Sequence, residues 1–145
     1  MYLTYEEYIN LGGELEQSTF SQLEFEARAY VDWYTFGRLK NEKTLPDAVK
    51  TLMVYLINLI IEKHKALNLS ANGIANISTN PNKEIVSQSN DGVSTTYNIQ
   101  SAGEIIKSSK SEVDSAINLY LYGIENSLGR KLLYRGLYPG EWYYE

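Results

Sequence analysis

Residues 44–67, TLPDAVKTLMVYLINLIIEKHKAL, decide the fold class of this chain. Apolar side chains recur there at steps of three and four, the spacing that gathers them on one face of an α-helix. They are Val49, Leu52, Met53, Leu56, Ile57 and Ile60. Thr44 is suited to cap this helix, and Pro46 fits its first turn, where a missing N–H removes no hydrogen bond. We therefore predict a helix over 46–67 at the centre of a helical core, fraying near 67–71, where Asn and Ser take over.

Two shorter helices are predicted before this central one. Residues 4–10 form the first, because Thr4 and Glu7 have the spacing of a capping box and two glycines follow. Residues 19–36 form the second, because their apolar residues share one helical face and Gly37 follows. A Ser or Thr at its start is the expected cap.

The chain ends with a further helix and a tail. A helix is predicted over 111–123, where Ser111 gives a start signal and an apolar stripe follows. Ser101 is the alternative start. The residues around Glu104 then form either an earlier turn of the same helix or a separate piece. Residues 130–145 are predicted to be an extended tail, and their apolar content requires a docking surface.

A polar insertion separates the central helix from the last one. Composition makes 70–84 a loop, and the Ser- and Thr-rich residues 85–99 are predicted to form a β-hairpin that turns at 90–92. An isolated two-stranded ribbon is marginal in water, so this hairpin leans either on a neighbouring subunit or on its own bundle. The expected fold is mainly α, a small bundle of three main helices and a short N-terminal one. The polar loop and β-hairpin are inserted before the last helix, within a single domain over 1–145.

Length and composition argue against several functional classes. With 145 residues, 43% hydrophobic content and a net charge of −5, the chain fits one folded domain and disfavours a dedicated nucleic-acid binder. There is no cysteine and one histidine, His64, which the helical spacing places toward the core. No nucleophile elbow, phosphate-binding loop or familiar metal-ligand pattern occurs in the sequence. We expect a non-enzymatic protein without cofactor or metal, and the sequence predicts neither a signal peptide nor a membrane span.

Charged and aromatic residues are distributed unevenly along the chain. An acidic front contains Glu6, Glu7, Glu14, Glu16, Glu24 and Glu26, and a basic stretch contains Arg130, Lys131 and Arg135. The two ends either attract each other, within or between subunits, or are ordinary solvated stretches. The 13 tyrosines lie mostly toward the same two ends, and tyrosine suits contacts where one edge is buried and the hydroxyl stays wet. These features favour a structural component of a larger assembly. The alternative explanation of the high tyrosine content is a low-GC coding bias.

A set of stretches recurs in an order that resembles one known family. The stretches are YLTYEEY (2–8), LGG (11–13), FEARAYVD (25–32), TFGRL (35–39), the Ser-rich hairpin and LLYRGL (132–137). Together they resemble the head–tail connector proteins of long-tailed bacteriophages and their prophages, also called head-completion or adaptor proteins. The resemblance covers roughly the first 65 and the last 60 residues and is vague over 66–84.

The resemblance implies a structural virion component rather than an enzyme. Such proteins form a ring, commonly of twelve copies, under the portal protein at the capsid vertex. The ring extends the DNA channel and docks the next neck or tail protein, and DNA passes through without sequence-specific binding. The resemblance therefore implies assembly in the bacterial host cytoplasm, a place at the head–tail junction of the virion, and no membrane partner.

The hairpin and the C-terminal tail are the predicted interface, because neither supports itself well. The predicted interface residues are Val86, Val93, Tyr97, Arg130, Lys131, Leu133, Tyr134, Arg135, Tyr138, Trp142 and Tyr143. Two other classes of protein remain open. One is a small monomeric or dimeric adaptor or regulatory protein that binds through its Tyr-rich surface. The other is a DNA-packaging accessory factor that grips duplex DNA.

Overall fold

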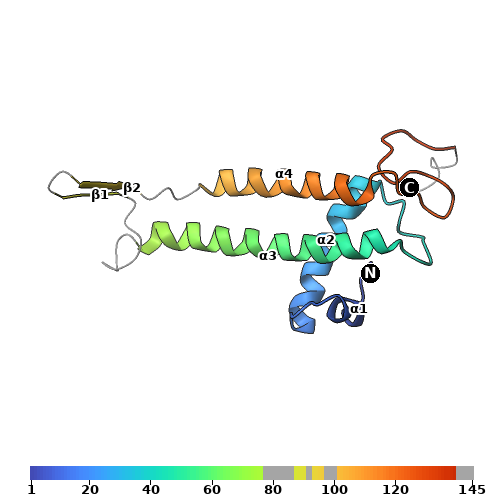
Figure 1. The fold of residues 1–145 in the computed structure, drawn as a ribbon, viewed down its shortest axis with the longest axis horizontal. Helices are drawn as coiled ribbons and strands as arrows, with labels where there is room; N and C mark the ends of the chain where they lie inside the picture. Colours follow the sequence, from blue (N-terminus) through green and yellow to red (C-terminus); the bar gives the residue numbers. More distant parts are fainter. Residues whose placement is uncertain (77–86, 91–92, 97–100, 140–145) are drawn as a thin grey trace. The chain divides into compact units, whose positions relative to one another are not determined.

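The chain folds mainly into helices, as predicted. The computed structural model describes the backbone of residues 1–76, 87–90, 93–96 and 101–139, and the side chains of 1–68 and 101–139. Within these residues it forms a small helical bundle. The elements in chain order are α1 (Tyr5–Asn10), α2 (Gln17–Thr35), α3 (Asp47–Asn76), β1 (Ser87–Asn90), β2 (Val93–Thr96) and α4 (Ala102–Leu121) (Figure 1).

The chain divides into two compact units. Unit 1 comprises Met1–Ile60 with Glu112–Glu145, and unit 2 comprises Ile61–Ser111. Unit 1 contains α1, α2, the first part of α3 and the second part of α4. Unit 2 contains the remainder of α3 and α4 with both strands. The single domain over 1–145 stays a prediction.

The core of unit 1 is built on the predicted apolar face of α3. Every residue of that face is at most 1% exposed, from Val49 through Ile60. Fully or nearly fully buried side chains from the rest of unit 1 complete the core: Leu3, Phe20, Ala27, Val31, Leu39, Ile117, Leu121 and Leu132. Leu132 lies after α4, so the core includes part of the chain that the sequence analysis treated as a tail.

The predicted capping box at the start of α1 is confirmed. The Glu7 amide donates to Thr4 Oγ1 (3.2 Å), and the Thr4 amide donates to Glu7 Oε2 (2.9 Å). Lys50 on α3 also donates through Nζ to Glu7 Oε1 at 2.7 Å, which links α1 to α3 within unit 1. These hydrogen bonds, chiefly that from Lys50, lower the pKa of Glu7 to about 2.

Acid should weaken this link between α1 and α3. Because the folded-state pKa of Glu7 lies below its unfolded value, its contribution is complete above about pH 5 and declines as the pH falls toward 2. We expect Glu7→Gln to lower the free energy of unfolding by about 1 kcal/mol at pH 7 and by much less at pH 2, measured by urea denaturation. Glu6→Gln, in the same turn but exposed, is the control. An equal loss for Glu7→Gln at both pH values would contradict this account.

The ends of α2 differ from the prediction. Glu16 occupies the N-cap without a side-chain hydrogen bond, so no Ser or Thr caps the helix. Ser21 instead donates its hydroxyl to the Gln17 carbonyl at 2.8 Å, within the first turns. At the other end Phe36 takes a left-handed conformation (φ 54°) before Gly37 (φ 68°), and the helix ends at Thr35.

The helices α3 and α4 differ from their predicted bounds of 46–67 and 111–123: α3 ends later than predicted, and α4 both begins and ends earlier. α3 continues to Asn76, because Asn and Ser lower helix stability only slightly per residue and no proline interrupts the run. α4 begins at Ala102, so the alternative start at Ser101 is the observed one. The Ser101 amide donates to Glu104 Oε2 (2.9 Å) and the Glu104 amide donates to Ser101 Oγ (3.3 Å), a reciprocal capping box.

The two strands lie within the predicted hairpin. β1 and β2 pair antiparallel, with Ser87 opposite Thr96 and Asn90 opposite Val93. The rest of the predicted hairpin, 85–86, 91–92 and 97–99, lies outside the described residues, as does most of the predicted loop over 70–84.

No helix in the described part of the chain combines the length and the apolar character needed to cross a bilayer.

Candidate functional site

The segment that follows α4 folds back onto unit 1, which corrects the prediction of an extended tail for its described part. Antiparallel hydrogen bonds join Leu132 N to the Ile124 carbonyl (2.9 Å) and Asn126 N to the Arg130 carbonyl (2.9 Å). The Ser127 hydroxyl donates to Glu42 Oε1 at 3.0 Å, which fixes this turn to the loop between α2 and α3. The burial of Leu132 adds an apolar anchor.

Arg38 is the main polar anchor of residues 130–139, named here the C-terminal segment. Its Nη1 donates to the carbonyl oxygens of Leu132 (3.0 Å) and Tyr134 (2.6 Å), with a longer bond to that of Lys131 (3.3 Å). Its Nη2 donates to the Gly136 carbonyl at 2.8 Å. A guanidinium presents its N–H donors in a rigid plane, so one side chain holds carbonyls over six residues of irregular backbone.

Aromatic rings surround the Arg38 guanidinium. Its Cζ lies 5.1 Å from the centroid of the Phe36 ring and 5.2 Å from that of Tyr138. Tyr138 also contacts the Arg130 guanidinium (5.6 Å) and the Tyr134 ring (5.0 Å). Such cation–π contacts add roughly 0.5–1 kcal/mol each at exposed sites. The left-handed turn at Phe36 therefore places both the ring and the following arginine against the C-terminal segment.

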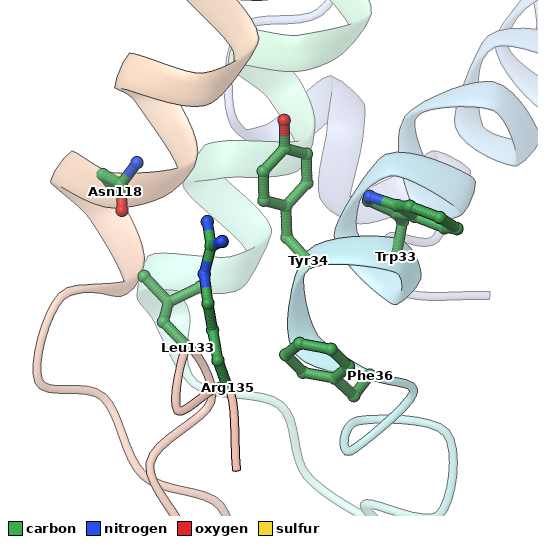
Figure 2. Close-up of a pocket in the computed structure, with 6 residues that line it drawn as sticks. All are labelled: Trp33, Tyr34, Phe36, Asn118, Leu133 and Arg135. Carbon is green, nitrogen blue, oxygen red and sulfur yellow. The ribbon is translucent and has the colours of Figure 1, made fainter.

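A groove of about 300 Å³ opens between the end of α2, the unit 1 part of α4 and the C-terminal segment, so it lies within unit 1. The described residues that line it are Trp33, Tyr34, Phe36, Asn118, Leu133 and Arg135. Figure 2 shows Leu133 and Arg135 rising from the C-terminal segment opposite the aromatic residues of α2 and its end, with Asn118 on α4 above them. Trp33 is 79% exposed and Phe36 57% exposed.

A second hollow adjoins this groove. It is lined by Tyr122, Gly123, Lys131, Leu133 and Tyr134, so Leu133 borders both. Tyr122 is 86% exposed and Tyr134 is 50% exposed. We name the combined area the aromatic surface, made of Trp33, Phe36, Tyr122, Leu133 and Tyr134 with the exposed cations Lys131 and Arg135.

The chemistry of the aromatic surface suits binding to protein. Tryptophan, tyrosine and arginine are the residues most enriched where binding energy concentrates at protein–protein interfaces. Exposed apolar side chains occur singly on most proteins, but a contiguous group flanked by cations marks an interaction site. No carboxylate is found among the described residues that line either hollow, so the surface favours a partner with acidic groups.

The structure brings together part of the predicted interface. Lys131, Tyr134 and Arg135 are exposed, whereas Arg130, Leu133 and Tyr138 are half-buried. All six lie on the C-terminal segment that Arg38 holds. The other predicted interface residues lie outside the described part of the chain. They are Val86, Tyr97, Trp142 and Tyr143, for which neither backbone nor side chain is described, and Val93, for which only the backbone is described.

Trp33 and Phe36 were missed by the sequence analysis. The apolar face predicted for 19–36 passes through Val31 and Tyr34, and Trp33 falls outside it. An aromatic side chain away from the buried face of a helix was the available signal. Arg38 gave no such signal, because its partners are backbone carbonyls of residues more than 90 positions away.

Two other residues, His64 and Glu24, differ from their predicted roles. His64 is exposed rather than core-facing, and it lies well inside α3 because that helix continues to Asn76. Glu24 is 2% exposed, so it does not belong to an exposed acidic front. Its Oε1 accepts a hydrogen bond from the Tyr2 amide at 2.8 Å, and its Oε2 lies 3.7 Å from Arg28 Nε.

The exposed part of the acidic front is Glu6, Glu14 and Glu16. Tyr2, whose amide is bonded to Glu24, donates its hydroxyl to Asp32. Burial and that carboxylate raise the pKa of the Tyr2 hydroxyl above its ordinary value. Among the side chains that the structure describes, no group of three His, Asp or Glu residues is placed to hold a metal ion.

Comparison of the chain with protein-family models, curated proteins and solved structures finds no match.

Proposed function

We propose that this chain is a structural subunit that assembles with copies of itself into a connector ring at the head–tail junction of a long-tailed bacteriophage. The observation that supports this most is the aromatic surface, where Trp33, Tyr122 and Tyr134 remain exposed beside Lys131 and Arg135. A surface of this composition suits a protein contact better than a reaction site. The sequence resemblance supplies the place in the virion.

Ring assembly requires two different faces on each subunit, since a ring is closed by heterologous contacts. The aromatic surface carries two exposed cations, and Glu6, Glu14 and Glu16 are exposed elsewhere in unit 1. The net charge of −5 leaves the subunit without the excess of cations that would retain passing DNA. In the proposed ring, DNA therefore passes without sequence-specific binding, and the portal and a neck or tail protein are the partners.

Reconstitution with the portal protein of the same phage tests this proposal. Electron microscopy of the mixture should reveal a ring of this chain on the portal. Trp33→Ala should weaken ring formation at least about tenfold, because exposed tryptophans at interfaces often carry much of the binding energy. Phe25→Ala is the matched control, since Phe25 is a 65% exposed aromatic on the same helix outside the aromatic surface, and it should assemble normally.

Two results would overturn the proposal. A chain that stays monomeric or dimeric at every concentration and leaves the portal bare would indicate a small adaptor protein. A salt-sensitive shift of random duplex DNA at physiological ionic strength would indicate a DNA-packaging factor.

A further inference from the structure

The groove beside Trp33 is aromatic and basic, and this composition favours one class of ligand. It is lined by three aromatic side chains, a half-buried leucine and the Arg135 guanidinium, and Lys131 lies in the adjoining hollow. A matching ligand is a short segment that carries aromatic rings and carboxylates and has no cations.

One segment of this same chain has that composition. Residues 140–145, Gly-Glu-Trp-Tyr-Tyr-Glu, contain three aromatic residues, two acids and no base. They follow Pro139 directly, whose carbonyl accepts a hydrogen bond from Arg130 Nη2 at 2.9 Å. Pro139, the residue before the segment, is therefore held on unit 1. Six residues reach at most about 20 Å from that point.

We propose that the groove of one copy binds residues 140–145 of a second copy. This inference rests on the proposed function and deepens it, because it identifies the two faces of the head-to-tail contact. Aromatic rings of the segment pack between Trp33, Phe36 and Leu133, and its carboxylates meet Arg135 and Lys131. Since groove and segment are different patches of one chain, the contact repeats from copy to copy, which is the kind of contact that a ring requires.

Arg38 prepares this groove before any partner arrives. It binds the carbonyls on both sides of Leu133, those of Leu132 and Tyr134, and its guanidinium contacts the Phe36 ring. Arg38 therefore holds both the Leu133 side and the Phe36 side of the groove. Preorganisation of this kind raises affinity by reducing the ordering needed on binding.

Two incomplete variants test the contact in a mixture. A chain truncated after Pro139 keeps the groove and loses the segment, whereas Arg135→Glu keeps the segment and reverses the charge of the groove. Each variant alone should stay monomeric, because each lacks one half of the contact. Mixed together, they should form a 1:1 heterodimer, which analytical ultracentrifugation detects. Lys43→Glu, an exposed charge reversal outside the groove, is the control for Arg135→Glu and should assemble as the unmodified chain does.

A peptide measurement complements the mixture. A fluorescently labelled peptide with the sequence of residues 140–145 should bind the truncated chain, and Arg135→Glu in that chain should weaken binding at least about tenfold. Absence of binding, or binding insensitive to Arg135→Glu, would overturn the inference. No heterodimer in the mixture would also overturn it, because the truncated chain offers an intact, empty groove and the Arg135→Glu chain offers an intact segment.

The outcomes separate this inference from the proposed function. If both incomplete variants still form rings on the portal, the ring proposal stands and the groove contact is wrong. If the heterodimer forms but the unmodified chain never forms a ring on the portal, the contact stands and the connector proposal fails.

Discussion

Arg38→Ala is expected to lower the free energy of unfolding by about 3 kcal/mol. The substitution removes the donor to the carbonyls of Leu132, Tyr134 and Gly136 and leaves their oxygens without this partner. Hydrogen bonds to charged groups contribute roughly 1.5–3 kcal/mol each, and water compensates for part of the loss at the exposed ones. Urea denaturation gives the free energy, and hydrogen exchange of the Leu132 amide, bonded to Ile124, reports release of the C-terminal segment.

Substitution of Arg38 by lysine distinguishes the contribution of the positive charge to stability from that of the planar guanidinium. Arg38→Lys retains the positive charge but loses the planar fork, so we expect at least half of the alanine effect. Lys40→Ala, an exposed cation two residues away, should change stability by less than about 0.5 kcal/mol. If Arg38→Ala left the exchange of the Leu132 amide unchanged, Arg38 would not anchor the C-terminal segment.

Gly13→Ala should also destabilise the protein, by about 3 kcal/mol. A Cβ at this position would overlap the Tyr8 ring. Tyr8 is 2% exposed and its ring centroid lies 4.8 Å from that of Phe20, so the ring has no room to retreat. The Gly13 amide is bonded to the Tyr8 carbonyl at 2.9 Å, which also limits movement of the backbone. Forced overpacking of this kind commonly removes 1–3 kcal/mol, measurable by urea denaturation.

Gly103→Ala is the matched control for that substitution. Gly103 lies in the first turn of α4, and a Cβ added there would lie 4.0 Å from Ser101 Oγ, an ordinary van der Waals distance. Alanine favours helix by up to about 1 kcal/mol over glycine, so this variant should be unchanged or slightly more stable. Equal stability of Gly13→Ala and the unmodified chain would mean that Tyr8 is not confined as described.

Local signals in the sequence were sufficient for the helical core. The apolar spacing from Val49 to Ile60 and the capping box at Thr4 depend on residues within a few positions of one another, and both are confirmed. The ends of α3 and α4 were harder to predict, because Asn and Ser are tolerated in a long helix. Ser101 and Glu104 have the capping spacing that marks the observed start of α4. Ser111 has a similar start signal, so the sequence left two possible starts.

The sequence predicted the interface residues on the C-terminal segment but not the contacts that hold this segment in place. Arg135 and Tyr134 were expected at an interface because the apolar content of the tail requires a docking surface. That reasoning missed the partner within the same subunit, since Arg38 recognises backbone carbonyls and no side-chain pattern records such a contact. Leu132 was likewise assigned to a tail, although it is fully buried. Contacts between residues far apart in sequence decided both outcomes.

Photocrosslinking at Trp33 tests most directly whether the aromatic surface joins one copy to the next. The photoreactive amino acid p-benzoylphenylalanine is introduced in place of Trp33, the protein is incubated with its portal, and crosslinked products are identified by mass spectrometry after irradiation. Our account predicts a covalent product between two copies of this chain, with the second copy linked through residues 140–145. Rings that form on the portal while Trp33 crosslinks only within its own copy, or only to the portal, would contradict it.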